Sequence, residues 1–238
     1  LVQLHKDMEQ EAEPEGGKIA DKYGKQISSK EKENMVTFKE LEKVRQKYEN
    51  NVKHIGYTQK SEGLKKAKHL DLLQKYLLAS IYTLMPPRRN AYAKMKIIKY
   101  KDYDKLPESE KQDNNYLVIY SRNKKKFAFG DFKTKKTFGL QEITIPKRLN
   151  SIINLWLHFN PNKEYLLIDK RGKAMTHNGL TKYLNKVFEP TGKKISTTML
   201  RKIYLTSKYG KLTEEMAEDA EKMGHSKSTQ QKYIKKKD

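Results

Sequence analysis

The chain has 238 residues, 36% of them hydrophobic, and its 51 lysines and arginines against 29 aspartates and glutamates give a formal net charge of +22. This length allows one large domain, or one compact domain with an appendage, and so cationic a chain is expected to bind a polyanion, with nucleic acid as the first candidate. Because the chain has no cysteine, disulfides, thiolate metal sites and cysteine nucleophiles are excluded.

Nothing in the sequence indicates a membrane protein. A spanning helix needs roughly 18 apolar residues, and the longest apolar run is interrupted by Asp71, Gln74 and Lys75. The stretch from Leu1 to Glu15 is acidic and lacks the apolar core of a signal peptide. The sequence therefore predicts a soluble, intracellular protein with no membrane partner.

The first part of the chain predicts an appendage. Residues 1 to about 35 have adjacent glycines and almost no apolar periodicity, which favours a flexible arm. Apolar residues then recur at helical spacing and predict one amphipathic helix: Phe38, Leu41, Val44, Tyr48 and Val52. One helix is too small for a domain. We therefore expect residues 1–62 to be an arm and a linker helix, the remnant of an N-terminal DNA-binding region in a fragment that opens on Leu1.

Residues 63–238 have the pattern of a folded domain. A second helix is predicted by apolar residues at i, i+3 and i+7 spacing: Leu70, Leu73, Leu77, Ile81 and Leu84. Pro86 and Pro87 end this helix, and Arg88 and Arg89 follow at once. Three β-like runs come next, at 116–120, 126–132 and 142–146, and predict a small antiparallel sheet.

The rest of the chain is predicted to be mostly helical. A helix over 147–159 precedes a brief strand over 165–168, and a further helix follows Thr176. Another helix starts near Thr197 and is expected to end at Gly210, and Thr213 caps a further one that Gly224 closes. A short terminal helix is expected to carry Thr229 and Tyr233, with His225 in the turn before it. The fold class expected from these elements is mixed α/β and mostly helical.

Two groups of residues predict chemistry. Only seven of the 51 basic residues are arginine, so arginine is expected where a planar, bidentate donor is needed, at Arg88, Arg89 and Arg201. Near the end of the chain, Gly-His-Ser at 224–226 precedes Tyr233, which shares a helix face with Thr229. Tyrosine is a nucleophile, but its pKa of about 10 means that cations or a base must help it lose its proton.

These motifs resemble the tyrosine recombinases, the phage-integrase and Cre-like family, in the family's order over about residues 64–238. The sequence Pro-Pro-Arg-Arg-Asn at 86–90 is similar to the first arginine motif in integrases of eukaryotic DNA viruses and related mobile elements. The resemblance implies a tyrosine-recombinase catalytic domain over 63–238. The catalytic residues that it implies are Arg88, Lys133, Arg201, His225 and Tyr233.

The same resemblance leaves alternatives at three places. Arg89 is the alternative to Arg88, since the motif offers two arginines. Lys135 and Lys136 are alternatives to Lys133 in the lysine turn after the second predicted strand. The family's His-x-x-Arg reads Thr-Met-Leu-Arg at 198–201, so Thr198 stands where the family has its general base, and the group that accepts the proton of Tyr233 is left open.

The mechanism that the resemblance implies needs no cofactor, metal or ATP. Tyr233 attacks a DNA phosphate to form a 3′-phosphotyrosyl link and a free 5′-hydroxyl, while Arg88 and Arg201 neutralise the non-bridging oxygens. His225 donates a hydrogen bond to the same phosphate, and Lys133 protonates the departing oxygen. A 5′-hydroxyl from another duplex then attacks the link, which rejoins the strands.

Two rival functions share these features. A type IB topoisomerase uses the same chemistry to relax DNA, although Met-Gly-His-Ser at 223–226 favours a recombinase. A catalytically silent DNA-binding descendant is allowed by Thr198, although such a protein does not need Tyr233, Arg88 and Arg201 together. The other histidines are expected to be ordinary surface or core residues without metal-site spacing: His5, His54, His69, His158 and His177.

The family also implies partners and a location. Double-stranded DNA is the expected substrate, with a homotetramer assembled on it and a monomer when free. An intracellular enzyme of this kind is expected in the nucleus of a eukaryotic host, or with the virion if its element is viral.

Overall fold

The computed structural model describes residues 29–55 and 67–234 of the chain. The chain forms two compact units: the large unit is Asn34–Tyr204, and the small unit is Leu1–Glu33 together with Leu205–Asp238. Most of the expected arm, and the boundary expected at residue 62, lie outside the described residues. The last part of that arm, α2 (Ser29–Asn34), is a short helix, which differs from the flexible segment predicted up to about residue 35.

Helix α3 (Phe38–His54) confirms the first predicted helix. Thr37 and Glu40 form a capping box at its start, with the Glu40 carboxylate 2.7 Å from the Thr37 backbone nitrogen. The apolar face of α3 packs against α4 (Ala67–Leu84), and the Tyr48 hydroxyl donates to the Val187 carbonyl at 2.6 Å. The linker helix is thus part of the core of the large unit.

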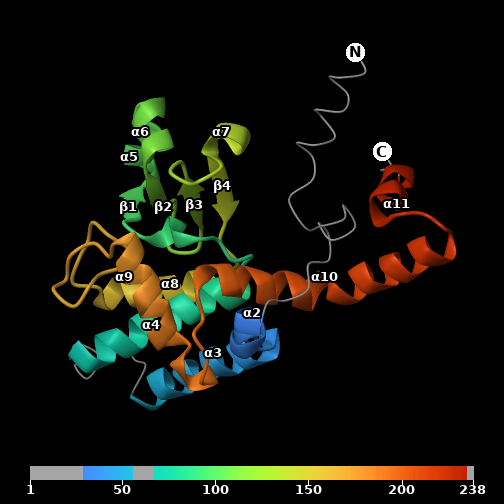
Figure 1. Ribbon diagram of the computed structural model, residues 1–238. Coiled ribbons are helices and arrows are strands. Elements are labelled where there is room, and N and C mark those ends of the chain that lie inside the picture. The colour runs from blue at the N-terminus through green and yellow to red at the C-terminus, as the bar shows by residue number, and fades with distance from the viewer. Residues whose placement is uncertain (1–28, 56–66, 235–238) are drawn as a thin grey trace. The chain divides into compact units, whose positions relative to one another are not determined.

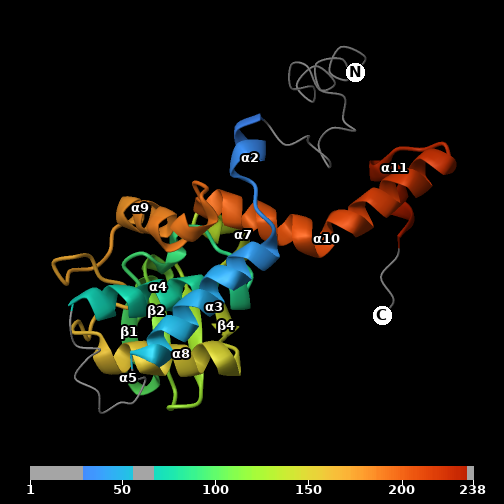
Figure 2. The same cartoon turned by 90° about the horizontal axis from the view of Figure 1, so that it is seen from below.

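The other predicted helices of the large unit also form where expected. Helix α4 ends at Leu84, just before the two prolines, and α8 (Lys147–Phe159) has the predicted bounds. Helix α9 (His177–Val187) is capped by Thr176. Figures 1 and 2 show α3, α4, α8 and α9 gathered on one side of the strands, and together they bury the main hydrophobic core.

The sheet has four strands in the order β1-β2-β3-β4: β1 (Lys96–Lys99), β2 (Asn115–Ile119), β3 (Lys125–Phe129) and β4 (Gln141–Thr144). The last three confirm the predicted strands and pair antiparallel. The prediction of an antiparallel sheet is wrong, because β1 pairs parallel to β2 and makes the sheet mixed. With a lysine at each end, the four residues of β1 show too little alternation to be recognised.

The two faces of the sheet enter different cores, as the period of two along a strand requires. Leu117, Phe127 and Phe129 point into the main core. Tyr116 and Val118, on the other face of β2, join a smaller cluster under the parallel connection. That connection consists of two short helices that the sequence did not reveal, α5 (Tyr100–Asp104) and α6 (Glu108–Asp113).

The segment 165–168, predicted as a strand, forms no strand of the sheet. It makes two isolated bridges, from Tyr165 to Lys96 and from Ile168 to Ala174. Gln74 satisfies the backbone of Ile168, with its side chain donating to the carbonyl at 3.0 Å and accepting from the nitrogen at 2.9 Å. A side chain of α4 therefore completes the backbone hydrogen bonding at the end of this segment.

Helix α10 (Thr197–Lys222) replaces the two helices predicted between 197 and 224. Gly210 does not end it, since a glycine inside a helix costs only about 1 kcal/mol. Thr213 is not a cap, because its hydroxyl donates to the Tyr209 carbonyl at 2.8 Å within the helix. Gly224 does follow the end of the helix, with a φ of 71° that suits glycine.

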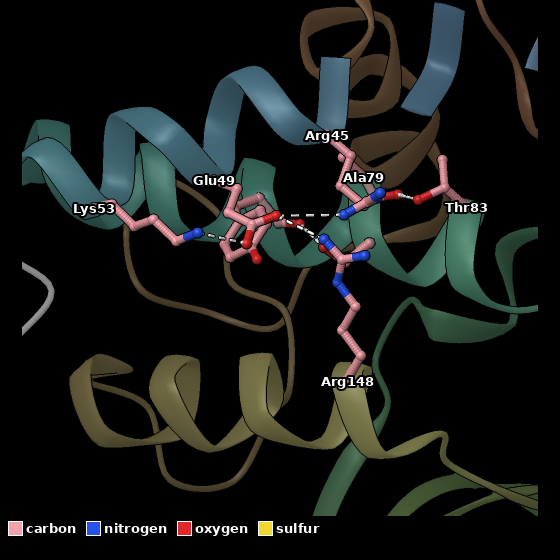
Figure 3. A network of polar contacts seen from close by, with 8 residues as sticks. Arg45, Glu49, Lys53, Ala79, Thr83 and Arg148 are labelled. Atoms are coloured by element: carbon pink, nitrogen blue, oxygen red, sulfur yellow. Dashed lines mark hydrogen bonds and ion pairs between the residues drawn. The ribbon is translucent and has the colours of Figure 1, made fainter. Parts of the chain in front are cut away.

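A polar network ties α3 to α8 in the large unit (Figure 3). The Glu49 carboxylate lies 2.8 Å from the Arg148 guanidinium and 3.4 Å from that of Arg45, which is 2% exposed. Burial lowers the pKa of Arg45, and the charge of Arg148 lowers it further. One carboxylate thus compensates two arginines, one of them buried.

Among the described residues, no helix is long and apolar enough to cross a membrane.

Candidate active site

A cleft of about 790 Å³ opens in the large unit. The residues lining it come from four separate stretches of the chain: 87–91, 131–134, His177 and the start of α10. Within the described part of the chain, four cationic side chains line the cleft against one carboxylate, that of Asp131. The cations are Arg88, Arg89, Lys133 and Arg201. Such a cleft favours an anionic ligand.

Arg88 is partly buried and held in place. Its guanidinium lies 4.0 Å from the ring centre of Phe129 and 4.8 Å from that of Phe132, a cation–π arrangement, and it donates to the Gln141 side chain at 2.8 Å. Burial lowers the pKa of Arg88, and the nearby charge of Arg201 also lowers it. In the described residues Arg88 forms no ion pair, so its charge is available to a ligand.

Arg89 also lines the cleft, but its side chain is exposed. Its backbone is fixed, because the Tyr82 hydroxyl donates to the Arg89 carbonyl at 3.1 Å. It precedes η3 (Asn90–Tyr92), whose Tyr92 is buried in the core. The structure therefore brings both alternatives for the first arginine to the cleft, with Arg88 the more constrained of the two.

Arg201 and Thr198 reach the cleft from the first turns of α10. Leu200 is fully buried and Arg201 beside it is partly exposed, so the helix presents Arg201 at the edge of its buried face. Thr198 is exposed and lies one turn before Arg201. Thr198 and Arg201 thus line the same space.

Lys133 is exposed in the connection from β3 to α7 (Lys135–Phe138) and lines the cleft. Lys135 does not line it, and its ammonium pairs with Asp113 at 3.2 Å. Lys136 is exposed and is also absent from the lining. Of the three lysines considered in the turn, Lys133 is the one that lines the cleft.

Asn115 joins two parts of the cleft lining. They are residues 87–91, here called the arginine segment, and residues 131–134 between β3 and α7, here called the lysine connection. Its side chain, 6% exposed, accepts from the Asp131 nitrogen at 3.0 Å and donates to the Asp131 carbonyl at 2.8 Å. It also donates to the Ala91 carbonyl at 3.0 Å. A Cβ on Gly130 would lie 2.0 Å from the Lys111 carbonyl, so only glycine allows β3 to approach α6 this closely. These contacts fix the backbone on either side of the cleft.

His225 and Tyr233 belong to the small unit, where they form a pair of their own. Helix α11 (Lys227–Tyr233) is capped by Ser226, whose hydroxyl accepts from the Thr229 nitrogen at 3.2 Å. The His225 and Tyr233 rings stack, with centroids 5.8 Å apart and an interplanar angle of 22°. Tyr233 is 72% exposed. The predicted helix and the histidine in the turn before it are confirmed.

The structure thus gathers the predicted site residues into two sets. Arg88, Arg89, Lys133, Thr198 and Arg201 line one cleft of the large unit, whereas His225 and Tyr233 lie together in the small unit. Sequence reasoning missed the exposed His177 at the cleft, because a single histidine at a helix start carries no motif. It also missed Asn115, whose amide bonds are visible only in the fold.

The described part of the chain offers no obvious metal centre, since no three His, Asp or Glu side chains there gather closely enough to hold an ion. The chain matches no known protein family, no curated protein and no solved structure at a significant level. A functional proposal therefore rests on the residues and their geometry.

Proposed function

We propose that the chain is a tyrosine recombinase, an enzyme that cleaves and rejoins DNA strands through a 3′-phosphotyrosyl intermediate. The observation that carries this proposal is the cleft, where two arginines and a lysine from distant parts of the chain face one space. When a nucleophile attacks a phosphodiester, negative charge builds up on the phosphate oxygens, and fixed cations stabilise that charge.

Each residue has a task in this proposal. Arg88 and Arg201 bind the non-bridging oxygens of the scissile phosphate, and Lys133 protonates the 5′-oxygen as the P–O bond breaks. Tyr233 is the nucleophile, and its exposure leaves it free to meet DNA. His225, stacked on Tyr233, donates a hydrogen bond to the phosphate.

The proposal extends to fold and partners. Residues 63–238 are a tyrosine-recombinase catalytic domain, and α3 is the linker helix that precedes it. The substrate is double-stranded DNA, on which four copies assemble. The enzyme acts in the nucleus of a eukaryotic host, or with a virion if its element is viral. The net charge of +22 supports the DNA partner.

A covalent-adduct assay tests the proposal. The protein is incubated with supercoiled plasmid in EDTA and quenched with SDS, and protein-linked nicks are counted. Tyr233→Phe is expected to bind DNA but to form no adduct, because the nucleophilic oxygen is gone. Tyr209→Phe is the matched control, since Tyr209 is also an exposed tyrosine of the small unit, and it should behave as wild type.

Three outcomes would contradict the proposal. Adducts that persist in Tyr233→Phe would remove this tyrosine as the nucleophile. Intact DNA binding without any adduct, on plasmid and on a suicide duplex carrying the native element ends, would indicate a silent DNA-binding protein. Adducts that lead to relaxation but never to strand exchange would instead assign the chain to the type IB topoisomerases.

A further inference from the structure

His177 lies at the cleft although no motif predicts it. It is the first residue of α9, its side chain is exposed, and it lines the same space as Arg88 and Arg201. Among the described residues that line the cleft it is the one histidine. An imidazole therefore faces the place where two arginines would bind a phosphate.

The start of α9 is fixed to the arginine segment by hydrogen bonds. The Asn90 amide donates to the Thr181 hydroxyl at 3.3 Å, and that hydroxyl donates to the His177 carbonyl at 3.1 Å. A second link joins the Lys94 nitrogen to the Met175 carbonyl at 3.0 Å. The backbone at His177 is thus held on both sides, which fixes the start of α9 beside the arginine segment.

The proposed reaction needs a proton acceptor at the cleft. At the position where the related enzymes have a base, this chain has Thr198, and a hydroxyl is a poor proton acceptor near neutral pH. Histidine is the side chain that most readily accepts and returns a proton in this range. His177 and Thr198 line the same cleft, so an imidazole is available where threonine cannot act.

We propose that His177 is a further catalytic residue and the general base of the cleavage step. This inference rests on the proposed function. In the DNA complex that the proposed function requires, Tyr233 attacks the phosphate bound at the cleft, and as the bond from the Tyr233 oxygen to phosphorus forms, the tyrosine proton passes to an imidazole nitrogen of His177. The bond from phosphorus to the 5′-oxygen breaks, and that oxygen takes a proton from Lys133. The reverse transfers accompany rejoining.

The first test exchanges the two positions. His177→Gln is expected to slow single-turnover cleavage by about 10²-fold, the lower range for loss of a general base. Because Thr198 is exposed on the same cleft, adding Thr198→His to His177→Gln should recover about tenfold or more of that loss. Circular dichroism should give unchanged melting for each variant.

The second test separates a base from an acid. In a substrate with a 5′-bridging sulfur, the leaving thiolate needs no proton because a thiol has a pKa of about 8.5. This substrate should restore the rate of Lys133→Ala and leave His177→Gln slow. His158→Gln is the matched control, because His158 is an exposed histidine of α8 outside the cleft lining, and it should cleave as wild type does.

The results of these tests distinguish a wrong assignment of His177 from a wrong proposed function. A wild-type rate for His177→Gln, restoration by the sulfur substrate, or no recovery with Thr198→His would each overturn the assignment of His177 as base. If these occur while adducts still depend on Tyr233, the proposed function stands and only His177 is removed. Absence of any Tyr233-dependent adduct in the wild type overturns both.

Discussion

The cleft of the large unit and residues 225–233 of the small unit, here called the terminal segment, are each stabilised by a different kind of contact. Arg88 is held by the rings of Phe129 and Phe132 and by Gln141, all far from it in sequence. Tyr233 is held by its own neighbourhood, on a seven-residue helix that begins directly after Ser226. One region depends on long-range packing and the other on local hydrogen bonds.

This difference matches the tasks that we propose. Stabilising developing charge requires donors that are already fixed when the reaction occurs, because reorganisation would consume the benefit. A nucleophile must instead be accessible, and Tyr233 is 72% exposed. Changes that affect the cleft should therefore act mainly on catalysis through geometry and charge, whereas changes in the terminal segment should act through the stability of a short helix.

The largest effect is expected at the cleft, from Arg201→Ala. Loss of one fixed cation should reduce cleavage by about 10²-fold or more, as for other electrostatic stabilisers. Single-turnover cleavage of a suicide duplex measures this rate. Arg171→Ala is the matched control, because Arg171 is exposed and pairs only locally with Asp169. Equal rates for Arg201→Ala and the wild type would remove Arg201 from the site.

A smaller effect is expected from Asn115→Leu, which keeps the side-chain size and removes three hydrogen bonds. We expect about 1–3 kcal/mol less stability and cleavage slowed by about tenfold or more, because small misplacements of catalytic groups are costly. If Asn115 acts by placing Lys133, the 5′-bridging sulfur substrate should restore much of the rate. Asn123→Ala, in an exposed turn, should change neither stability nor rate.

A slow Asn115→Leu enzyme that the sulfur substrate does not restore would show that the damage is not at the lysine connection. The hydrogen bonds of Asn115 would then affect the rate through the arginine segment, which Asn115 contacts at the Ala91 carbonyl, and not through Lys133.

The smallest effect is expected in the terminal segment, from Ser226→Ala. This change removes the cap of α11 and about 1 kcal/mol of helix stability. Cleavage should therefore fall about fivefold, with DNA binding unchanged. Ser226→Asp, which can also cap, should retain wild-type cleavage. Ser207→Ala, an exposed serine of α10, is the control. A loss as large as that of Arg201→Ala would contradict the distinction between the two regions.

The parts of the fold that sequence predicts are those with strong periodicity or caps. Helices α3, α4, α8 and α9 form over nearly the expected ranges because each combines an apolar stripe with a clear start or stop. The continuity of α10 could not be read in this way, since Gly210 and Thr213 favour a break locally but lie inside a helix that continues. Tertiary context decides such positions.

The candidate site could also be predicted only in part from the sequence. The motifs around Arg88, Lys133 and Arg201 select candidate residues, but the sequence does not show that they meet, and the structure brings them to one cleft. His177 has no motif and could be recognised only after α9 was placed. The parallel strand β1 was missed for a similar reason, because a strand of four residues with lysine at either end has no distinct pattern.

The most direct test of the proposed function is whether Tyr233 becomes covalently joined to DNA. We would trap the adduct on a suicide duplex, digest the protein and the DNA, and locate the attached nucleotide by tandem mass spectrometry. The account predicts a single modified peptide in which Tyr233 carries a nucleotide through its 3′-phosphate. A nucleotide attached to any other residue, or through a 5′-phosphate, would contradict it.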